Sequence, residues 1–436
     1  MNNYRKWLLG EVELWQSQGI IDASQANQIT GLYPYHQETN WGKVIFAGIG
    51  AIIFGLGIIL VFAYNWEAMH RFTKLGIVLL SVAVAHVIGF HYSREHSAHK
   101  RIGESLHLLG TMLFGAGIWL IAQIYHIDEH YPNAFLVWAL GAMAMGWVLP
   151  SLGHTFLALV LVFLWHWFET FEFRSVNHGA VWLVLLGILP IALIMRSLSA
   201  LFLTCCMLIF SYSISYSTVA ERSDETLVCV MLVLSGVFIL GSHLAVKSQF
   251  PQCQNVLRVV GVGVFSVLLF IVTFDEFDRV RFENDLSTVS TVTWFYFAFP
   301  VVAFSVALAR ILMVSNLMRD KTETLELVLV AATVYVAVLS VFPVLGIYKA
   351  VWVFYSIAFL AYSVLLIYRG SLYLRWQSTT LGGLMLSAYT FARFMDLFDS
   401  LLMRGMAFLV VGAMLFGIGI YYSRQKQFAE QARGVA

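Results

Sequence analysis

Apolar runs of about 20 residues follow one another along most of this chain, and the first extends from Val44 to Tyr64. A helix of that length crosses a hydrocarbon core of about 30 Å. The runs are continuously apolar rather than alternating, which excludes a membrane β-barrel. With 60% hydrophobic and 12% charged residues, the chain has about half the charged fraction of a soluble domain. The sequence therefore predicts an all-α, polytopic transmembrane helix bundle.

The apolar runs predict about fourteen spans, with boundaries uncertain by a few residues. Where two runs meet near Pro150 and near Gly346, re-entrant segments are the alternative to full crossings. The predicted spans are 43–64, 71–92, 103–125, 133–150, 152–168, 178–195, 198–220, 226–246, 254–274, 291–312, 324–344, 348–368, 373–395 and 401–422.

The basic residues between the spans predict the orientation. If the N-terminus is cytoplasmic, most of the 26 lysines and arginines fall in cytoplasmic segments, among them Lys43, Arg196, Arg258 and Arg369. The positive-inside rule then places both termini in the cytoplasm, which requires an even number of spans. The predicted location is the bacterial inner membrane.

Residues 1–40, before the first span, are predicted to form a short cytosolic helical hairpin. Val12 lies on the apolar face of a first helix that Gly19 ends, and Asp22 with Gln25 forms a capping box at the start of a second. We expect the hairpin to pack as a lid on the protein's own inner surface. Docking of a partner protein is the alternative.

The transmembrane domain, residues 41–436, contains an internal repeat. Gly50–Ile58 aligns without a gap with Gly110–Ile118, and the same string recurs at Gly412–Ile420. Its glycines leave one stripe of each helix without side chains, so neighbouring helices can approach closely. Within residues 41–130 this pattern favours a duplicated helical hairpin over chance similarity.

Polar side chains gather at the span ends that face outward in this orientation. Because polar groups are costly in lipid, such positions indicate function. The candidate ligand-binding residues are Asn65, Trp66, Gln123, Tyr125, His126, Glu169, Arg393 and Asp396. We expect them to form one periplasm-facing pocket, and an interfacial belt of aromatic and polar residues is the alternative.

Two of these positions suggest specific contacts. Arg393 and Asp396 are three residues apart and can pair on one helix face, which would present a guanidinium to a phosphate or carboxylate. Gln123 lies deeper in its helix, where its amide requires an interhelical hydrogen bond or a ligand contact.

The sequence predicts no cofactor, no metal site and no nucleic-acid partner. The net charge is +1, without a basic tract, and no nucleotide-binding loop or nucleophile elbow occurs. His126 to His130 fits an H-x-x-E-H zinc string, but Pro132 follows too soon for two full helical turns, so zinc is disfavoured. No residue is assigned as catalytic. The cysteines, which lack the spacing of a disulfide framework or metal site, are Cys205, Cys206, Cys229 and Cys253.

Several of these residues also carry a family resemblance. The strings around Asn65 and Trp66, from Gln123 to His126 and from Arg393 to Asp396, with the helical pattern from Trp15 to Ala26, resemble the bacterial predicted-membrane-protein family called domain of unknown function 2157. The resemblance covers roughly the first 170 residues well. It implies a short helical unit before a span that ends in Asn-Trp, but no activity and no catalytic residue.

The leading hypothesis is a non-enzymatic protein that binds, and transports or handles, a small or lipid-linked ligand through the periplasm-facing pocket. A sensor or scaffold subunit that acts through a protein partner at the hairpin is the second hypothesis. The third is an enzyme on a lipid-linked substrate, with Glu169, Asp396 or the pair Asp128 and Glu129 as acid or base. Membrane lipids are expected partners in each case.

Overall fold

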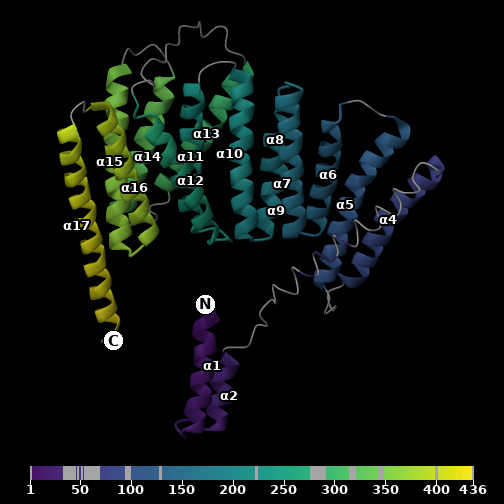
Figure 1. Ribbon diagram of the computed structural model, residues 1–436, viewed down its shortest axis with the longest axis horizontal. Helices are drawn as coiled ribbons and strands as arrows, with labels where there is room; N and C mark the ends of the chain where they lie inside the picture. The colour runs from purple at the N-terminus through teal and green to yellow at the C-terminus, as the bar shows by residue number, and fades with distance from the viewer. Residues whose placement is uncertain are drawn as a thin grey trace. The chain divides into compact units, whose positions relative to one another are not determined.

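The computed structural model of the protein consists of helices (Figure 1). It contains no strand among the residues that it describes, so the predicted all-α class is confirmed for them. Contacts divide the chain into two units, Met1–Lys74 and Leu75–Ala436. The described residues are 2–32, 46, 49–50, 53, 69–93, 100–126, 130–220, 224–274, 291–313, 321–341, 348–397 and 401–434.

The first unit contains α1 (Asn2–Ser17) and α2 (Ala23–Leu32). Gly19, with a backbone φ of +73°, lies in the turn between them, in a conformation that favours glycine. The Gln25 backbone amide donates to Asp22 Oδ1 at 2.7 Å, and the Asp22 amide donates to Gln25 Oε1 at 3.0 Å. The predicted capping box is therefore confirmed. Val12 and Ala26 are the buried apolar residues of this helix pair.

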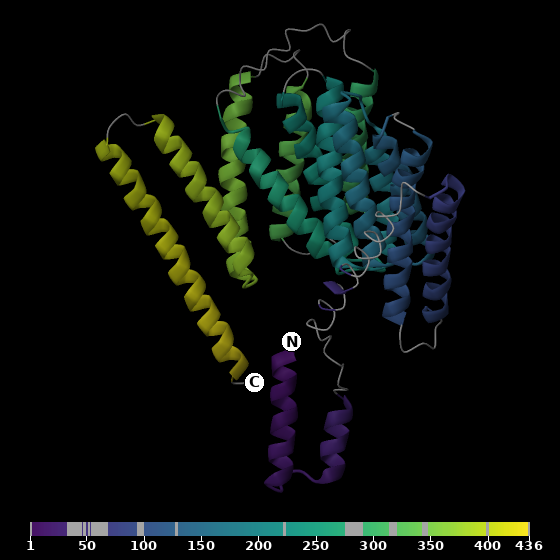
Figure 2. The same ribbon diagram turned by 45° about the vertical axis from the view of Figure 1, so that its right-hand side comes forward.

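The other helices alternate in direction along the chain, except that η1 continues α7 and that η2 and α9 continue α8 (Figures 1 and 2). Two of them, η1 and η2, are π-helical. They are α4 (Arg71–Tyr92), α5 (Lys100–Tyr125), α6 (Pro132–Val148), α7 (Leu152–Trp167), η1 (Phe168–Glu172), α8 (Gly179–Trp182), η2 (Leu183–Ile188), α9 (Leu189–Ile194), α10 (Leu198–Ala220), α11 (Asp224–Ala245), α12 (Cys253–Ile271), α13 (Thr291–Met313), α14 (Lys321–Ser340), α15 (Tyr348–Leu372), α16 (Trp376–Leu397) and α17 (Leu401–Gly434).

Nine helices among the described residues are long and apolar enough to cross a membrane, so the protein is a multi-pass membrane protein. They coincide with the predicted spans 71–92, 103–125, 152–168, 198–220, 226–246, 254–274, 291–312, 324–344 and 348–368. Shorter apolar helices occupy Pro132–Val148, Gly179–Ile194 and Phe408–Tyr421. The predicted span 373–395 is helical as part of α16 but is not among the nine. Most of the first predicted span, 43–64, lies outside the described residues.

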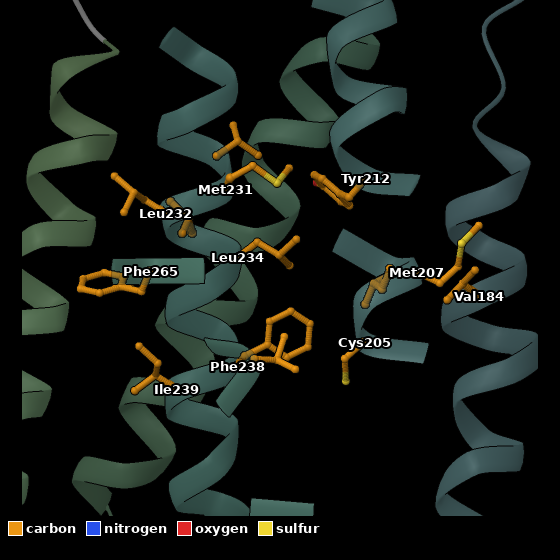
Figure 3. Packing of buried hydrophobic residues seen from close by; sticks show 14 of the residues in the cluster. Val184, Cys205, Met207, Tyr212, Met231, Leu232, Leu234, Phe238, Ile239 and Phe265 are labelled. Atoms are coloured by element: carbon orange, nitrogen blue, oxygen red, sulfur yellow. The ribbon is translucent and has the colours of Figure 1, made fainter. Parts of the chain in front are cut away.

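Helix α11 lies at the centre of the largest buried cluster. It packs against α10, α12, α13 and α14, and Leu232 and Ile239 on it have no exposed surface. Figure 3 shows these side chains together with Phe265 of α12 and Tyr212 of α10. A helix that is apolar all round is expected to be surrounded by others. Because lipid is as apolar as leucine, close packing rather than escape from water holds such helices together.

On α5, side chains of the neighbouring helices pack against the predicted stripe of glycines. A methyl group placed on Gly110 would lie 2.7 Å from Nε2 of His86 on α4, and one on Gly115 would lie 2.0 Å from the Trp138 ring on α6. Larger residues at these positions would force the neighbouring helices to move. Methyl groups on the equivalent glycines of α17 would meet no described atom within 4 Å, at Gly412, Gly417 and Gly419.

The connections between helices define two ends of the bundle. The turns at 149–151, 195–197, 246–252 and 373–375 lie at the end drawn lower in Figure 1, which we call the lower end. The C-terminal ends of α5, η1, α12 and α14 lie at the opposite, upper end. Under the predicted orientation the upper end is the one that faces outward.

Candidate functional site

Charged side chains lie inside the lower end of the bundle, where α12, α14 and α15 meet. The carboxylate of Glu326 on α14 is fully buried and binds two arginines. Nη2 of Arg258 on α12 donates to both carboxylate oxygens, at 2.8 and 3.0 Å. Nη1 of Arg369 on α15 donates to Oε2. One acid thus joins three helices.

Two further side chains complete this group. His243 on α11 is buried, and its Nε2 lies 3.9 Å from Glu326 Oε2 without a hydrogen-bond partner among the described residues. Nη2 of Arg369 also donates to Oε1 of Glu323 at 3.5 Å, and the Glu323 side chain is 34% exposed. The group, which we call the Glu326 cluster, therefore extends from a buried acid to the surface. Its members are His243, Arg258, Glu323, Glu326 and Arg369.

Helix geometry explains how the sequence builds this cluster. Glu323 and Glu326 are three residues apart and lie on one face of α14. Arg258 is the only charged residue within α12, and its helix packs against α11 and α15. A charge at the centre of a membrane helix costs about 2.5–3.5 kcal/mol by insertion scales, and ion pairing within the bundle offsets the smaller penalty nearer the helix ends. Removal of one partner leaves the other buried and uncompensated.

The sequence analysis missed this cluster. Glu326 stands within the predicted span 324–344, so an acid inside an apolar run was the available signal. Arg258 and Arg369 entered that analysis only as basic residues that determine orientation. Their convergence was not readable, because they lie 68 and 43 positions from Glu326 in the chain.

Arg393 of α16 lies at the upper end, against α12 and α15. Its guanidinium donates to the backbone carbonyl of Thr273, just beyond α12, and Nε1 of Trp352 donates to the same carbonyl at 2.7 Å. The rings of Trp352, Tyr389 and Phe274 have their centroids 5.0, 5.4 and 5.8 Å from Arg393 Cζ. These distances allow cation–π attraction. Arg393 thus places a positive charge at the C-terminal end of α12, where carbonyls lack helical partners.

A second group at the upper end surrounds Glu169 in η1. Its Oε2 lies 2.5 Å from Nε2 of His130, and the hydroxyl of Tyr131 donates to the carboxylate of Glu172. Burial and this hydrogen bond raise the pKa of Tyr131 to about 12. π-Helical turns often occur at functional sites, and this one places both acids against the connection between α5 and α6.

Three predicted site residues end helix α5. Gln123, Tyr125 and His126 are exposed, and His126 adopts a left-handed backbone conformation with φ of +53°. Among the described residues, the Gln123 amide therefore has no interhelical hydrogen bond.

The structure does not bring Glu169 and Arg393 together. The helices that carry Arg393 and the α5 residues, α16 and α5, lie far apart in both views (Figures 1 and 2). The described candidates thus form two groups at one end of the bundle. Asn65, Trp66 and the side chain of Asp396 lie outside the described residues, so their place in a pocket and the ion pair between Arg393 and Asp396 stay predictions.

The described residues also bear on metal chemistry. They contain no group of three or more His, Cys, Asp or Glu side chains that could hold a metal ion. Residues 127–129 of the H-x-x-E-H string lie outside the described ranges. The four cysteines are free thiols.

Comparison with known proteins gives a match for one region of the chain, and that match is to a family model. No curated protein and no solved structure matches the chain. The Glu326 cluster lies outside the region that a family model matches, whereas α4, α5 and α6 lie within it. The resemblance seen in the sequence is confirmed: residues 13–155 of this multi-pass membrane protein match the family described as predicted membrane protein (DUF2157).

Proposed function

We propose that this protein binds a small or lipid-linked ligand and moves or handles it across the bacterial inner membrane. In this proposal the chain has about fourteen spans and both termini in the cytoplasm, and its upper end faces the periplasm. The observation that supports it is the Glu326 cluster, whose buried charges lie within membrane-spanning helices. Ionisable groups inside spans are rare and mark the pathways of substrates and ions.

Helices α12 and α15 link the two ends of the proposed path. On α12, Arg258 lies about 23 Å from Thr273, the acceptor of Arg393, at 1.5 Å per residue. On α15, Trp352 and Arg369 lie about 26 Å apart by the same rule. A guanidinium therefore occupies each end of one pair of helices, separated by most of the hydrocarbon thickness of about 30 Å.

Apolar rings fill the space between these two ends. Phe265 of α12 and Phe359 and Tyr362 of α15 have at most 1% of their surface exposed. The ring of Phe265, which Figure 3 shows within the core, lies 5.2 Å from that of Tyr362 between centroids. The path is closed in this conformation, so transport requires α12 and α15 to separate. Alternation of this kind around a central site is common in secondary transporters.

The upper end supplies the proposed periplasmic site. Arg393 is held at the upper ends of α12 and α15, where its guanidinium offers a positive charge that suits a phosphate or carboxylate on the ligand. Asn65, Trp66 and Asp396 remain predicted ligand-binding residues in this proposal. A second contact region at the same end consists of Gln123, Tyr125, His126 and Glu169.

Transport by the full chain in liposomes tests the proposal. Solid-supported membrane electrophysiology with a panel of carboxylates and phosphate esters measures charge movement, and fluorescent phospholipids quenched from outside measure lipid movement. We expect activity with at least one class, lost in Arg393→Ala. Arg375→Ala, which changes an exposed arginine next to the same helix, is the matched control and should keep activity. Failure of every probe in the wild type would refute transport.

The N-terminal unit supports a second candidate function, that of a sensor or scaffold subunit. Trp7 and Leu14 of α1 are seven residues apart, on one helix face, and are 61% and 50% exposed. Such a face suits a protein partner. Deletion of residues 1–32 should leave transport intact under the first proposal, whereas a sensor would lose the response that it transmits.

A further inference from the structure

The buried part of the Glu326 cluster carries more positive than negative charge. The guanidiniums of Arg258 and Arg369 surround one carboxylate, and the second acid, Glu323, lies at the partly exposed edge. In a region of low dielectric, uncompensated charge is costly. The two guanidiniums can therefore hold the negative charge of a ligand in place of that of Glu326.

Hydrogen-bond donors also remain around Glu326. Arg258 reaches both carboxylate oxygens through one nitrogen, although a guanidinium has five N–H donors. Nε2 of His243 is buried, lies 3.9 Å from Glu326 Oε2 and has no hydrogen-bond partner among the described residues. A buried nitrogen without a partner has lost the hydrogen bond that it made in water, so a bound species that supplies one here would be favoured.

The helix α15 adds another polar group to this site. Tyr362 is fully buried, and its hydroxyl interacts electrostatically with Glu326, Arg258 and Arg369. The groups that face Glu326 therefore come from α11, α12, α14 and α15, and all of them except Glu323 are able to donate hydrogen bonds. From the lower end, Glu323 and Arg369 form a continuous polar link to the buried carboxylate.

From these contacts we infer that the cluster is a binding site for a small oxyanion, a carboxylate or a phosphate, and that Glu326 occupies it as a tethered carboxylate. The inference rests on the proposed ligand-handling function and names the chemical class of the ligand. An arriving oxyanion takes over the hydrogen bonds of Arg258 and Arg369. The displaced Glu326 carboxylate takes up one proton from water, because a second unpaired negative charge inside the bundle is too costly. Oxyanion and proton are therefore bound together.

Equilibrium binding to the purified full chain in detergent tests this inference. Acetate and inorganic phosphate serve as probes in isothermal titration calorimetry. Glu326→Gln removes the tethered competitor and should bind acetate roughly tenfold more tightly than the wild type. The double variant Glu326→Gln with Arg369→Gln should lose this gain. Glu13→Gln, which alters an exposed acid of α1, is the matched control and should bind acetate like the wild type.

A measurement on the wild type does not depend on the folding of any variant. Because one proton is bound with each oxyanion, the affinity for acetate should rise by up to about tenfold for each pH unit as the pH falls from about 8 to about 6. In Glu326→Gln the affinity should not change over this range. Equal affinity of wild type and Glu326→Gln for both probes, or a pH-independent wild type, would overturn the inference.

Short-chain phosphatidic acid is the third probe and distinguishes the source of the oxyanion. If Glu326→Gln binds all three probes, the ligand is a free anion. If it binds the lipid phosphate tightly and inorganic phosphate no better than the wild type does, the ligand is a lipid headgroup. Since these are binding measurements in detergent, absent transport with retained oxyanion binding refutes the transport proposal alone.

Discussion

Trp352 and Arg393 donate hydrogen bonds to the same atom, the backbone carbonyl oxygen of Thr273. The donors belong to α15 and α16, and the acceptor follows α12, so one carbonyl joins three helices. Arg393 also lies over the Trp352 ring, with 5.0 Å between Cζ and the ring centroid. The two side chains therefore support each other as well as α12.

Trp352→Phe tests the hydrogen bond separately from the ring. We expect it to lower the free energy of unfolding by about 1 kcal/mol, because it removes the N–H donor and keeps an aromatic face for Arg393. Trp352→Ala should cost more, since the ring is lost as well. Thermal unfolding of the purified protein in detergent measures both, and equal losses would contradict the assignment of a separate hydrogen bond.

The Glu326 cluster predicts a strong dependence of stability on charge pairing. Arg258→Met should destabilise the protein by roughly 3–5 kcal/mol, because Glu326 remains buried with one guanidinium. The triple variant Arg258→Met, Glu326→Leu and Arg369→Met should recover much of this loss, since no unpaired charge is left. If the triple variant is stable but no longer binds an oxyanion, the charges of the cluster serve function. If the triple variant is as unstable as Arg258→Met, they serve the stability of the fold.

The glycine stripe of α5 gives a prediction with an internal control. Gly115→Ala should destabilise the protein by about 1–3 kcal/mol, because the added methyl group would meet the Trp138 ring. Gly412→Ala, at the aligned place on α17, meets no described atom within 4 Å and should be neutral or stabilising by up to about 1 kcal/mol. Similar effects in thermal unfolding would show that the two copies pack alike.

Tyr131 predicts a pH effect at the upper end. Its pKa in the folded protein is raised to about 12, above the value of about 10 for a free tyrosine. The protonated hydroxyl of Tyr131 therefore contributes its full stabilisation of the fold below about pH 10, and this contribution is lost as the pH rises through about 12. Absorbance titration of the phenolate, with Tyr131→Phe as the reference, should show that Glu172→Gln lowers this pKa. An unchanged titration would exclude Glu172 as a cause.

Local patterns were sufficient for much of the fold. A long apolar run identifies a membrane helix without knowledge of its neighbours, and the capping box of Asp22 and Gln25 depends only on residues three positions apart. The alternation of spans also indicates at which end of the bundle a residue lies. For this reason Glu169 and Arg393 were correctly expected at the same end.

The lateral order of the helices was not readable in the same way. An apolar helix such as α11 has no polar face that would show which neighbour it meets, so the sequence did not reveal that α5 and α16 lie far apart. The meeting of Glu326 with Arg258 and Arg369 depends on the same long-range order. The candidate residues that the structure describes therefore lie in two groups at one end, and the cluster at the opposite end was overlooked.

Biogenesis must accommodate the buried acid of α14. Because α12 precedes α14 in synthesis, Arg258 is already in the membrane when Glu326 leaves the translocon, whereas Arg369 arrives only with α15. A nascent chain halted before α15 thus holds Glu326 with one of its two guanidiniums. We therefore expect the segment from α12 to α15 to insert as a cooperative unit, in which Arg369 of α15 supplies the second guanidinium for Glu326 of α14.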